Sequence, residues 1–82
     1  MPAEAPPTLP TADPVTVADI CRKAIDEDRR VWVQYADADG VRTELVEPID
    51  LRVGRLSGWS LHAARMITVP LSRIAAVGGA DD

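Results

Sequence analysis

Residues 58–74, GWSLHAARMITVPLSRI, decide the fold that the sequence predicts. Apolar and polar side chains alternate here twice, first around Trp59 and then over residues 67–71, and this period of two is typical of half-buried β-strands. Ala64-Arg65, between the two runs, is the best place for a tight reversal. We therefore expect a hairpin with Trp59 in the core and the single histidine, His62, on the opposite side from its neighbours.

The same period of two continues upstream of this hairpin. Residues 31–35 form a β-prone run that ends at Asp39-Gly40, a favourable turn because glycine tolerates a positive φ. A long extended segment follows over 41–53, and Pro48 inside it predicts an edge, a bend or a bulge because proline has no N–H to donate. A short last strand is expected over 74–77.

Ahead of the strands, the apolar spacing changes to that of one helical face. Residues 17–25 follow the spacing i, i+3, i+4, i+7, i+8. Thr16 with Asp19 three residues later resembles a capping box at the start of a helix. We expect a helix over about 16–29, with Cys21 on its apolar face as a buried, inert thiol.

One helix followed by about five short antiparallel strands predicts a mainly β fold, a small SH3/Sm-like barrel with the helix packed across it. No connection is long enough to hold the helix that a parallel crossover needs. The predicted core consists of Val17, Ile20, Ala24, Ile25, Val31, Val33, Tyr35, Leu45, Ile49, Leu51, Trp59, Leu61, Val69, Leu71 and Ile74.

The composition divides the chain into three parts. Residues 1–14 hold five of the seven prolines and only one large aliphatic residue, which predicts a disordered tail or linker. Residues 15–79 form the barrel domain, and 80–82 an acidic tail. A domain of about 65 residues is marginally stable by itself, so a homodimer or attachment to a larger protein is plausible.

Charge is unevenly distributed along the chain. The formal net charge is −4, which does not suit a strong DNA binder. Residues 15–40 carry six acidic against four basic residues, whereas 41–79 carry five arginines against three acidic residues, so the second half could hold a modest basic face. With no signal peptide and no apolar run that could span a membrane, we expect a cytoplasmic protein without membrane contact.

The residues that catalysis needs are scarce. One cysteine excludes an internal disulfide and a cysteine-based zinc site. One histidine, no acidic pair at a convincing spacing and no glycine-rich phosphate loop leave no catalytic set to assemble. We expect a protein that is not an enzyme and that has no cofactor and no metal.

Arginines provide the candidate binding site. Curling of the sheet could bring several of their planar guanidinium groups onto one face, where they would contact phosphate. An aromatic ring from Trp59, Tyr35 or His62 could then stack on a base. The simpler interpretation is a solvated face with scattered Arg–Asp pairs, each contributing little. The arginines concerned are Arg42, Arg52, Arg55, Arg65 and Arg73.

In this order the elements resemble the WYL domain family over about residues 18–77. That family has a helix ending in Ala-Ile, a strand ending in tyrosine, a strand with proline, a Trp-Tyr-Leu strand and a strand ending in Asp-Arg-Ile. The matching residues are Ala24-Ile25, Val33 and Tyr35, Gly40, Val46 with Pro48, Trp59 and Leu61, and Val69, Leu71, Arg73 and Ile74. The chain departs from the pattern at Ser60, Ser72 and Glu44, and in a shorter connection after Leu61.

The resemblance implies an Sm/SH3-like barrel found in bacterial transcription regulators and DNA-processing proteins, which senses nucleotides or single-stranded nucleic acid. It carries over Trp59, Arg73, Arg42 and Arg65 as binding positions. The expected function is a non-enzymatic regulatory or ligand-sensing module. The alternative is a protein-interaction or dimerisation module without a ligand, in which an exposed Trp32 and the strand edges make the contact.

Overall fold

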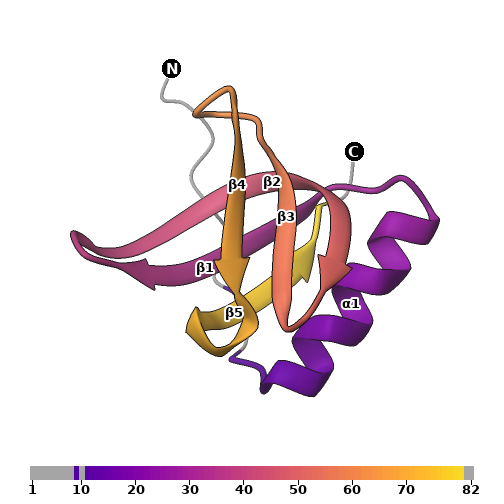
Figure 1. The fold of residues 1–82 in the computed structure, drawn as a ribbon, viewed down its shortest axis with the longest axis horizontal. Coiled ribbons are helices and arrows are strands. Elements are labelled where there is room, and N and C mark those ends of the chain that lie inside the picture. The colour runs from indigo at the N-terminus through magenta and orange to yellow at the C-terminus, as the bar shows by residue number, and fades with distance from the viewer. Residues whose placement is uncertain (1–8, 10, 81–82) are drawn as a thin grey trace.

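The computed structural model of the chain describes residue 9 and residues 11–80 (Figure 1). The elements in chain order are α1 (Pro14–Asp26), β1 (Val31–Asp37), β2 (Gly40–Arg52), β3 (Arg55–Ser60), β4 (Arg65–Pro70), the 3₁₀ turn η1 (Leu71–Arg73) and β5 (Ile74–Gly79). The predicted fold class, mainly β with one N-terminal helix and five antiparallel strands, is confirmed. Most of the two predicted tails (residues 1–8, 10 and 81–82) lies outside the described residues.

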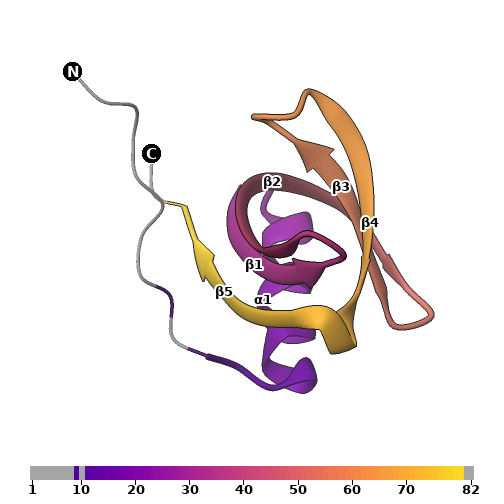
Figure 2. The same cartoon turned by 90° about the vertical axis from the view of Figure 1, so that its left-hand side faces the viewer.

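The five strands form one curled sheet in the order β4-β3-β2-β1-β5, and α1 packs across one side of it (Figure 2). Within the described residues β4 and β5 are the two edges, so the sheet is open rather than a closed ring. The N-terminal segment adds to the β5 edge. Thr11 bridges to Ala76, and the N–H of Ala12 donates to the carbonyl of Ala75 at 3.0 Å.

The helix begins two residues before its predicted start. Asp13 is the N-cap and its carboxylate accepts the N–H of Thr16 at 2.8 Å, while Pro14 takes the first helical turn, where its missing N–H costs nothing. The same hydrogen bond lowers the pKa of Asp13 below its ordinary value. The prediction of Thr16 as the cap was wrong because Asp13, three residues earlier, caps the helix, so that Thr16 already lies in its first turn.

The interior lies between α1 and the concave side of the sheet. Seven predicted core residues are buried, namely Val17, Ala24, Val31, Val33, Tyr35, Val69 and Ile74, and they are joined by Cys21, Val46, Leu56 and Val77. Six more predicted core residues are half-buried, namely Ile20, Ile25, Leu45, Leu51, Leu61 and Leu71. Ile49 and Trp59 are exposed, so their assignment to the core was wrong.

The wrong assignment of Trp59 concerns the phase of β3, that is, which of its alternating residues point into the core. Leu56, Gly58 and Ser60 point inward, and Trp59, which lies between them in register, points outward and is 38% exposed. A shift of one residue in a strand exchanges its two faces. On the neighbouring strand β2, the predicted irregularity at Pro48 is confirmed as a register shift between Pro48 and Asp50.

Trp32 is buried, at 8% exposed, so the prediction of an exposed contact residue was wrong. It lies on β1 between Leu45 of β2 and Gly78 of β5, and its ring centroid is 6.1 Å from that of His62. The side chain of Leu9 lies against Gly78. Because β1 is flanked by two strands and these groups cover its second face at Trp32, both faces of β1 are interior at that end of the strand.

Cys21 has no exposed surface, and burial raises the pKa of its thiol from 9.0 to about 11. Folding therefore favours the neutral thiol, and this contribution to stability is complete below pH 9 and is lost as the pH rises towards 11. We expect a disulfide reagent at pH 8 to react with the native thiol at least about 100-fold more slowly than with the unfolded chain. Equal rates in buffer and in denaturant would contradict the burial of Cys21.

Candidate functional site

A buried carboxylate, that of Glu44, lies at the centre of the main polar cluster of the described residues. Glu44 is 7% exposed and points inward from β2. Its Oε1 accepts the hydroxyl of Ser60 at 2.7 Å and its Oε2 accepts the hydroxyl of Tyr35 at 3.0 Å. The cluster thus joins β1, β2 and β3 through charge-assisted hydrogen bonds, the stronger kind.

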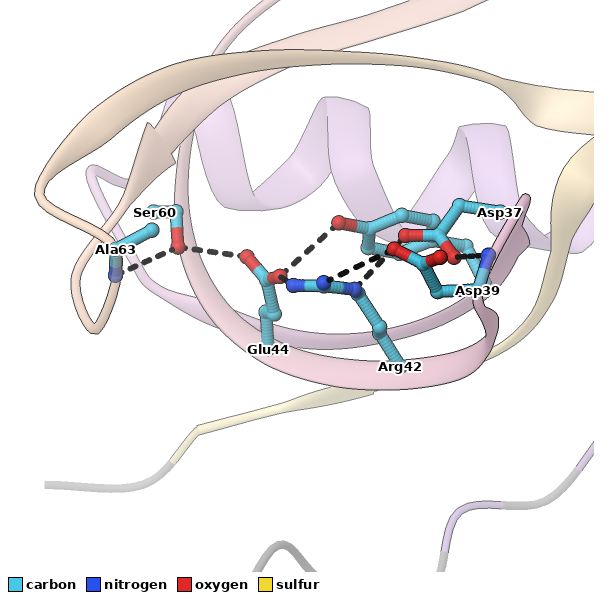
Figure 3. Close-up of polar contacts among 7 residues, drawn as sticks. Asp37, Asp39, Arg42, Glu44, Ser60 and Ala63 are labelled. Carbon is cyan, nitrogen blue, oxygen red and sulfur yellow. Dashed lines mark hydrogen bonds and ion pairs between the residues drawn. The ribbon is translucent and has the colours of Figure 1, made fainter.

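Arg42 approaches the same carboxylate from the side opposite to Ser60 (Figure 3). Its Nη1 lies 3.6 Å from Glu44, its Nε lies 2.8 Å from Asp37 and its Nη2 lies 3.9 Å from Asp39. Three carboxylates therefore surround one guanidinium. Arg42 is already neutralised, and a phosphate brought to it would meet the negative charge of these neighbours.

Tyr35 acts in the cluster as a donor. Burial, reinforced by the hydrogen bond to the Glu44 carboxylate, raises the pKa of its phenol above the ordinary value. The Tyr35 phenol therefore stays protonated and donates its hydrogen bond to the Glu44 carboxylate. No buried side-chain polar atom of the described residues lacks a partner, so the cluster is closed and structural in character.

A shallow pocket of about 360 Å³ opens beside this cluster. Arg42, Thr43, Glu44, His62 and Ala63 line it, and the N–H of Ala63 donates to the Ser60 oxygen at 3.3 Å. His62 is exposed in the β3–β4 turn, where its ring lies near that of Trp32. The pocket combines a buried carboxylate with a neutralised guanidinium, which does not favour an anionic ligand.

A second arrangement lies on the other side of the sheet, on a surface that we call the outer β3–β4 face. It consists of Arg55, Ser57 and Trp59 of β3 with Met66 and Thr68 of β4, which alternate with the inward residues of these strands. Trp59 pairs with Met66, and the hydroxyls of Ser57 and Thr68 lie 3.2 Å apart. An exposed indole thus shares a strand face with a guanidinium and two hydroxyls.

The arginines of the candidate site fall into three places. Arg52 and Arg55 lie at the β2–β3 turn beside a pocket of about 250 Å³, and Arg52 forms an ion pair with Asp50 at 3.1 Å. Arg65 begins β4, next to the β3–β4 turn that carries His62. Arg42 and Arg73 are both close to Asp37 at the β1–β2 hairpin.

The five arginines differ in whether a carboxylate pairs with them. Within the described part of the chain, Arg55, Arg65 and Arg73 have no ion-pair partner. Arg55 shares its strand face with Trp59, whereas Arg65 pairs with the inward Ser60 and alternates away from the outer β3–β4 face. The five arginines therefore do not converge on one surface, and of the five Arg55 is the one on the strand face of the exposed Trp59.

Sequence reasoning missed the cluster around Glu44, although the pattern contained a signal for it. The β1–β2 hairpin turns at Ala38-Asp39, one residue before the predicted Asp39-Gly40, and sets a register in which Val33 pairs with Glu44 and Tyr35 with Arg42. Inward positions two apart on neighbouring strands are diagonal neighbours, so the turn alone places the phenol near the carboxylate. The contribution of Ser60 depends on the phase of β3, which the alternation of large side chains did not reveal.

Two general features follow from the described residues. They contain no group of three or more His, Cys, Asp or Glu side chains arranged to hold a metal ion. Among their helices there is none with the length and apolar character to cross a membrane.

Comparisons with known proteins add one finding on the fold. No protein-family profile matches the chain, and no curated protein matches it. Among solved structures, the chain is similar to proteasome accessory factor B/C (PafBC) of Arthrobacter aurescens, with a TM-score of 0.73 and 17% identity. The similarity covers 84% of this chain and 12% of PafBC, so the chain spans a small part of that protein's length. At this identity the similarity shows a shared fold.

Proposed function

We propose that the chain is a WYL-like, non-enzymatic regulatory module that binds single-stranded nucleic acid through the outer β3–β4 face. Two independent observations support a WYL-related module, the ordered motifs of the sequence and the fold shared with a segment of PafBC. A cytoplasmic location is part of the proposal. Arg42 is not part of the binding surface, because three carboxylates surround it.

The observation that carries the binding surface is the exposed indole of Trp59 on the same strand face as Arg55. Stacking of a base on an aromatic ring and contact of a guanidinium with the backbone are the two interactions that sequence-tolerant single-strand binders combine. Ser57 and Thr68 lie between the two groups and offer hydroxyl donors to phosphate oxygens. Arg65 pairs with the inward Ser60 and so alternates away from this face, which leaves Arg55 as the cation beside Ser57 and Trp59.

The test is a titration of the chain with a short oligothymidylate at low salt, followed by amide chemical shifts and anisotropy. We expect Trp59→Ala to weaken binding by about 10-fold or more, since stacking on one base contributes about 1–3 kcal/mol. Arg55→Gln should lower the slope of log K against log salt by about 0.7, the value for one phosphate contact on a single strand. Arg22→Gln on the far side of α1 is the matched control and should change neither quantity.

Two outcomes would count against this surface. Binding that is insensitive to salt would contradict phosphate contacts, and binding that survives Trp59→Ala but not Arg42→Gln would move the site to the Glu44 cluster. Shifts confined to Ser57, Trp59 and Thr68 would support the proposal.

Protein contact through the same face is the second candidate, and a different observation favours it. Trp59 of β3 and Met66 of β4 are exposed large apolar residues, Ile49 of β2 is another, and the outer edge of β4 has no partner strand within the described residues. In that case Met66→Ala should weaken self-association or partner binding while Arg55→Gln leaves it unchanged. The nucleic-acid proposal predicts the opposite for oligothymidylate binding, which Arg55→Gln should weaken more than Met66→Ala does.

A further inference from the structure

A pocket of about 390 Å³ lies away from both arrangements described above, at the C-terminal end of α1. Figure 1 shows the end of α1, the start of β1 and the end of β5 close together, and the N–H of Ala80 donates to the carbonyl of Arg30 at 3.1 Å. Ile20, Ala24 and Val31 form an apolar floor, of which Ala24 and Val31 are buried. The volume is in the range of pockets that hold small molecules.

The rim of this pocket is cationic. Lys23, Arg29 and Arg30 line it together with one carboxylate, that of Glu27, which lies 3.2 Å from Arg29. That pair cancels its own charge. Lys23 and Arg30 have no ion-pair partner within the described part of the chain, so both cationic groups are available to a ligand at the edge of the apolar floor.

The backbone at the helix end does not oppose an anion as strongly as a bare C-terminus would. Asp28, in the left-handed conformation with φ 54°, reverses the chain so that its N–H reaches the carbonyl of Ile25 at 3.3 Å. The N–H of Arg29 donates to the carbonyl of Ala24 at 2.8 Å, and that of Glu27 to Lys23 at 3.0 Å. The last helical carbonyls are therefore engaged by the loop.

We infer that this pocket binds an amphipathic monocarboxylate, with its apolar body on Ile20, Ala24 and Val31 and its carboxylate between Lys23 and Arg30. Charge complementarity selects the anion, and the apolar floor selects a ligand with a hydrocarbon or aromatic body rather than free phosphate. The site is independent of the proposed nucleic-acid surface, because none of its lining residues belongs to β3 or β4.

The probes are octanoate, octylammonium and the tripeptide N-acetyl-Gly-Gly-Leu, each titrated into the chain and followed by amide chemical shifts. We expect octanoate to shift the amides of Ala24, Arg30 and Gly79 saturably, while octylammonium leaves them unchanged. The carboxylate could belong to the C-terminus of a peptide or to a free acid, and the tripeptide distinguishes the two. If the tripeptide binds more tightly than octanoate, the ligand is the carboxyl end of a peptide. If it binds more weakly, the ligand is a free acid. Either result supports the inference.

Variants test the contacts separately from the fold. The double change Lys23→Gln with Arg30→Gln should weaken octanoate by about 10-fold or more, equivalent to about 1.4 kcal/mol, whereas Arg22→Gln, outside the pocket on the same helix, should not. Gly79→Val fills the pocket from a position where an added Cβ meets nothing within 4 Å, and it should abolish octanoate binding and leave oligothymidylate binding intact. Equal shifts with octanoate and octylammonium, or octanoate binding unchanged by the double variant, would overturn the inference.

Discussion

Replacement of Glu44 by alanine is expected to destabilise the fold by about 3 kcal/mol, because it removes the common acceptor of two buried hydroxyls and one ion pair. Tyr35 and Ser60 would then keep buried O–H groups without a partner, and each such group costs about 1–3 kcal/mol. Arg42 would keep its ion pair with Asp37, so the loss of the Arg42–Glu44 pair adds little to the destabilisation. A domain of this size has roughly 4–10 kcal/mol of stability in total. We therefore expect the midpoint of thermal unfolding to fall by about 15 °C.

The measurement is urea unfolding followed by circular dichroism. Glu44→Gln keeps one acceptor oxygen at nearly the same place and should lose less than Glu44→Ala, because the hydroxyls can rotate to accept from the new amide. Glu47→Ala, an exposed carboxylate on the same strand, is the matched control and should stay within about 0.5 kcal/mol of the parent. A Glu44→Ala protein as stable as the Glu47→Ala protein would show that the buried cluster contributes nothing to the fold.

The periods of the sequence predicted which elements form, because helix and strand spacing are imposed by local geometry. The helix was predicted over about 16–29 and spans 14–26, and the first hairpin was predicted to turn at Asp39-Gly40 and turns at Ala38-Asp39. These elements and the irregularity at Pro48 follow from such local rules, with errors of one to three residues at their ends. The strand order and the open edges do not, because they depend on which strands meet in space. The cap of the helix was misplaced by three residues, since Asp13 and Thr16 are both good caps and only the position of the chain over β5 distinguishes them.

The candidate site was predictable in its residue types and not in its grouping. The sequence identified Arg55 and Trp59, and their position on one face follows once the phase of β3 is known. It also identified Arg65, whose pairing with Ser60 places it on the other face. The sequence predicted scattered Arg–Asp pairs only as a general alternative and did not single out Arg42, because its pairing depends on the Asp37 and Asp39 side chains approaching it at the hairpin. Trp59 was predicted in the core and is exposed, whereas Trp32 was predicted to be exposed and is buried. Hydrophobicity alone does not distinguish two tryptophans on strands with different neighbours.

The phase of β3 is set by its smallest residue, and Gly58→Ala should therefore be as damaging as the loss of Glu44. A Cβ at Gly58 would lie 2.6 Å from Cγ1 of Val46, 2.7 Å from the carbonyl oxygen of Glu47 and 3.0 Å from Cα of Pro48. Two of these three atoms belong to the backbone of β2, which can move only by separating the strands. We expect a loss of about 3 kcal/mol, at the upper end for overpacking, measured by urea unfolding.

Two other glycines provide graded controls for this steric argument. Gly79→Ala meets nothing within 4 Å and should be neutral, whereas Gly78→Ala meets only the terminal Cδ2 of Leu9 at 2.9 Å and should cost less than Gly58→Ala. If alanine is equally tolerated at all three positions, the close approach of β2 and β3 does not fix the register. If Gly58→Ala alone is damaging, the contact that turns Gly58 inward is also the one that turns Trp59 outward, since adjacent strand residues face opposite sides. The exposed indole on which the nucleic-acid proposal rests would then be a consequence of a missing Cβ one residue before it.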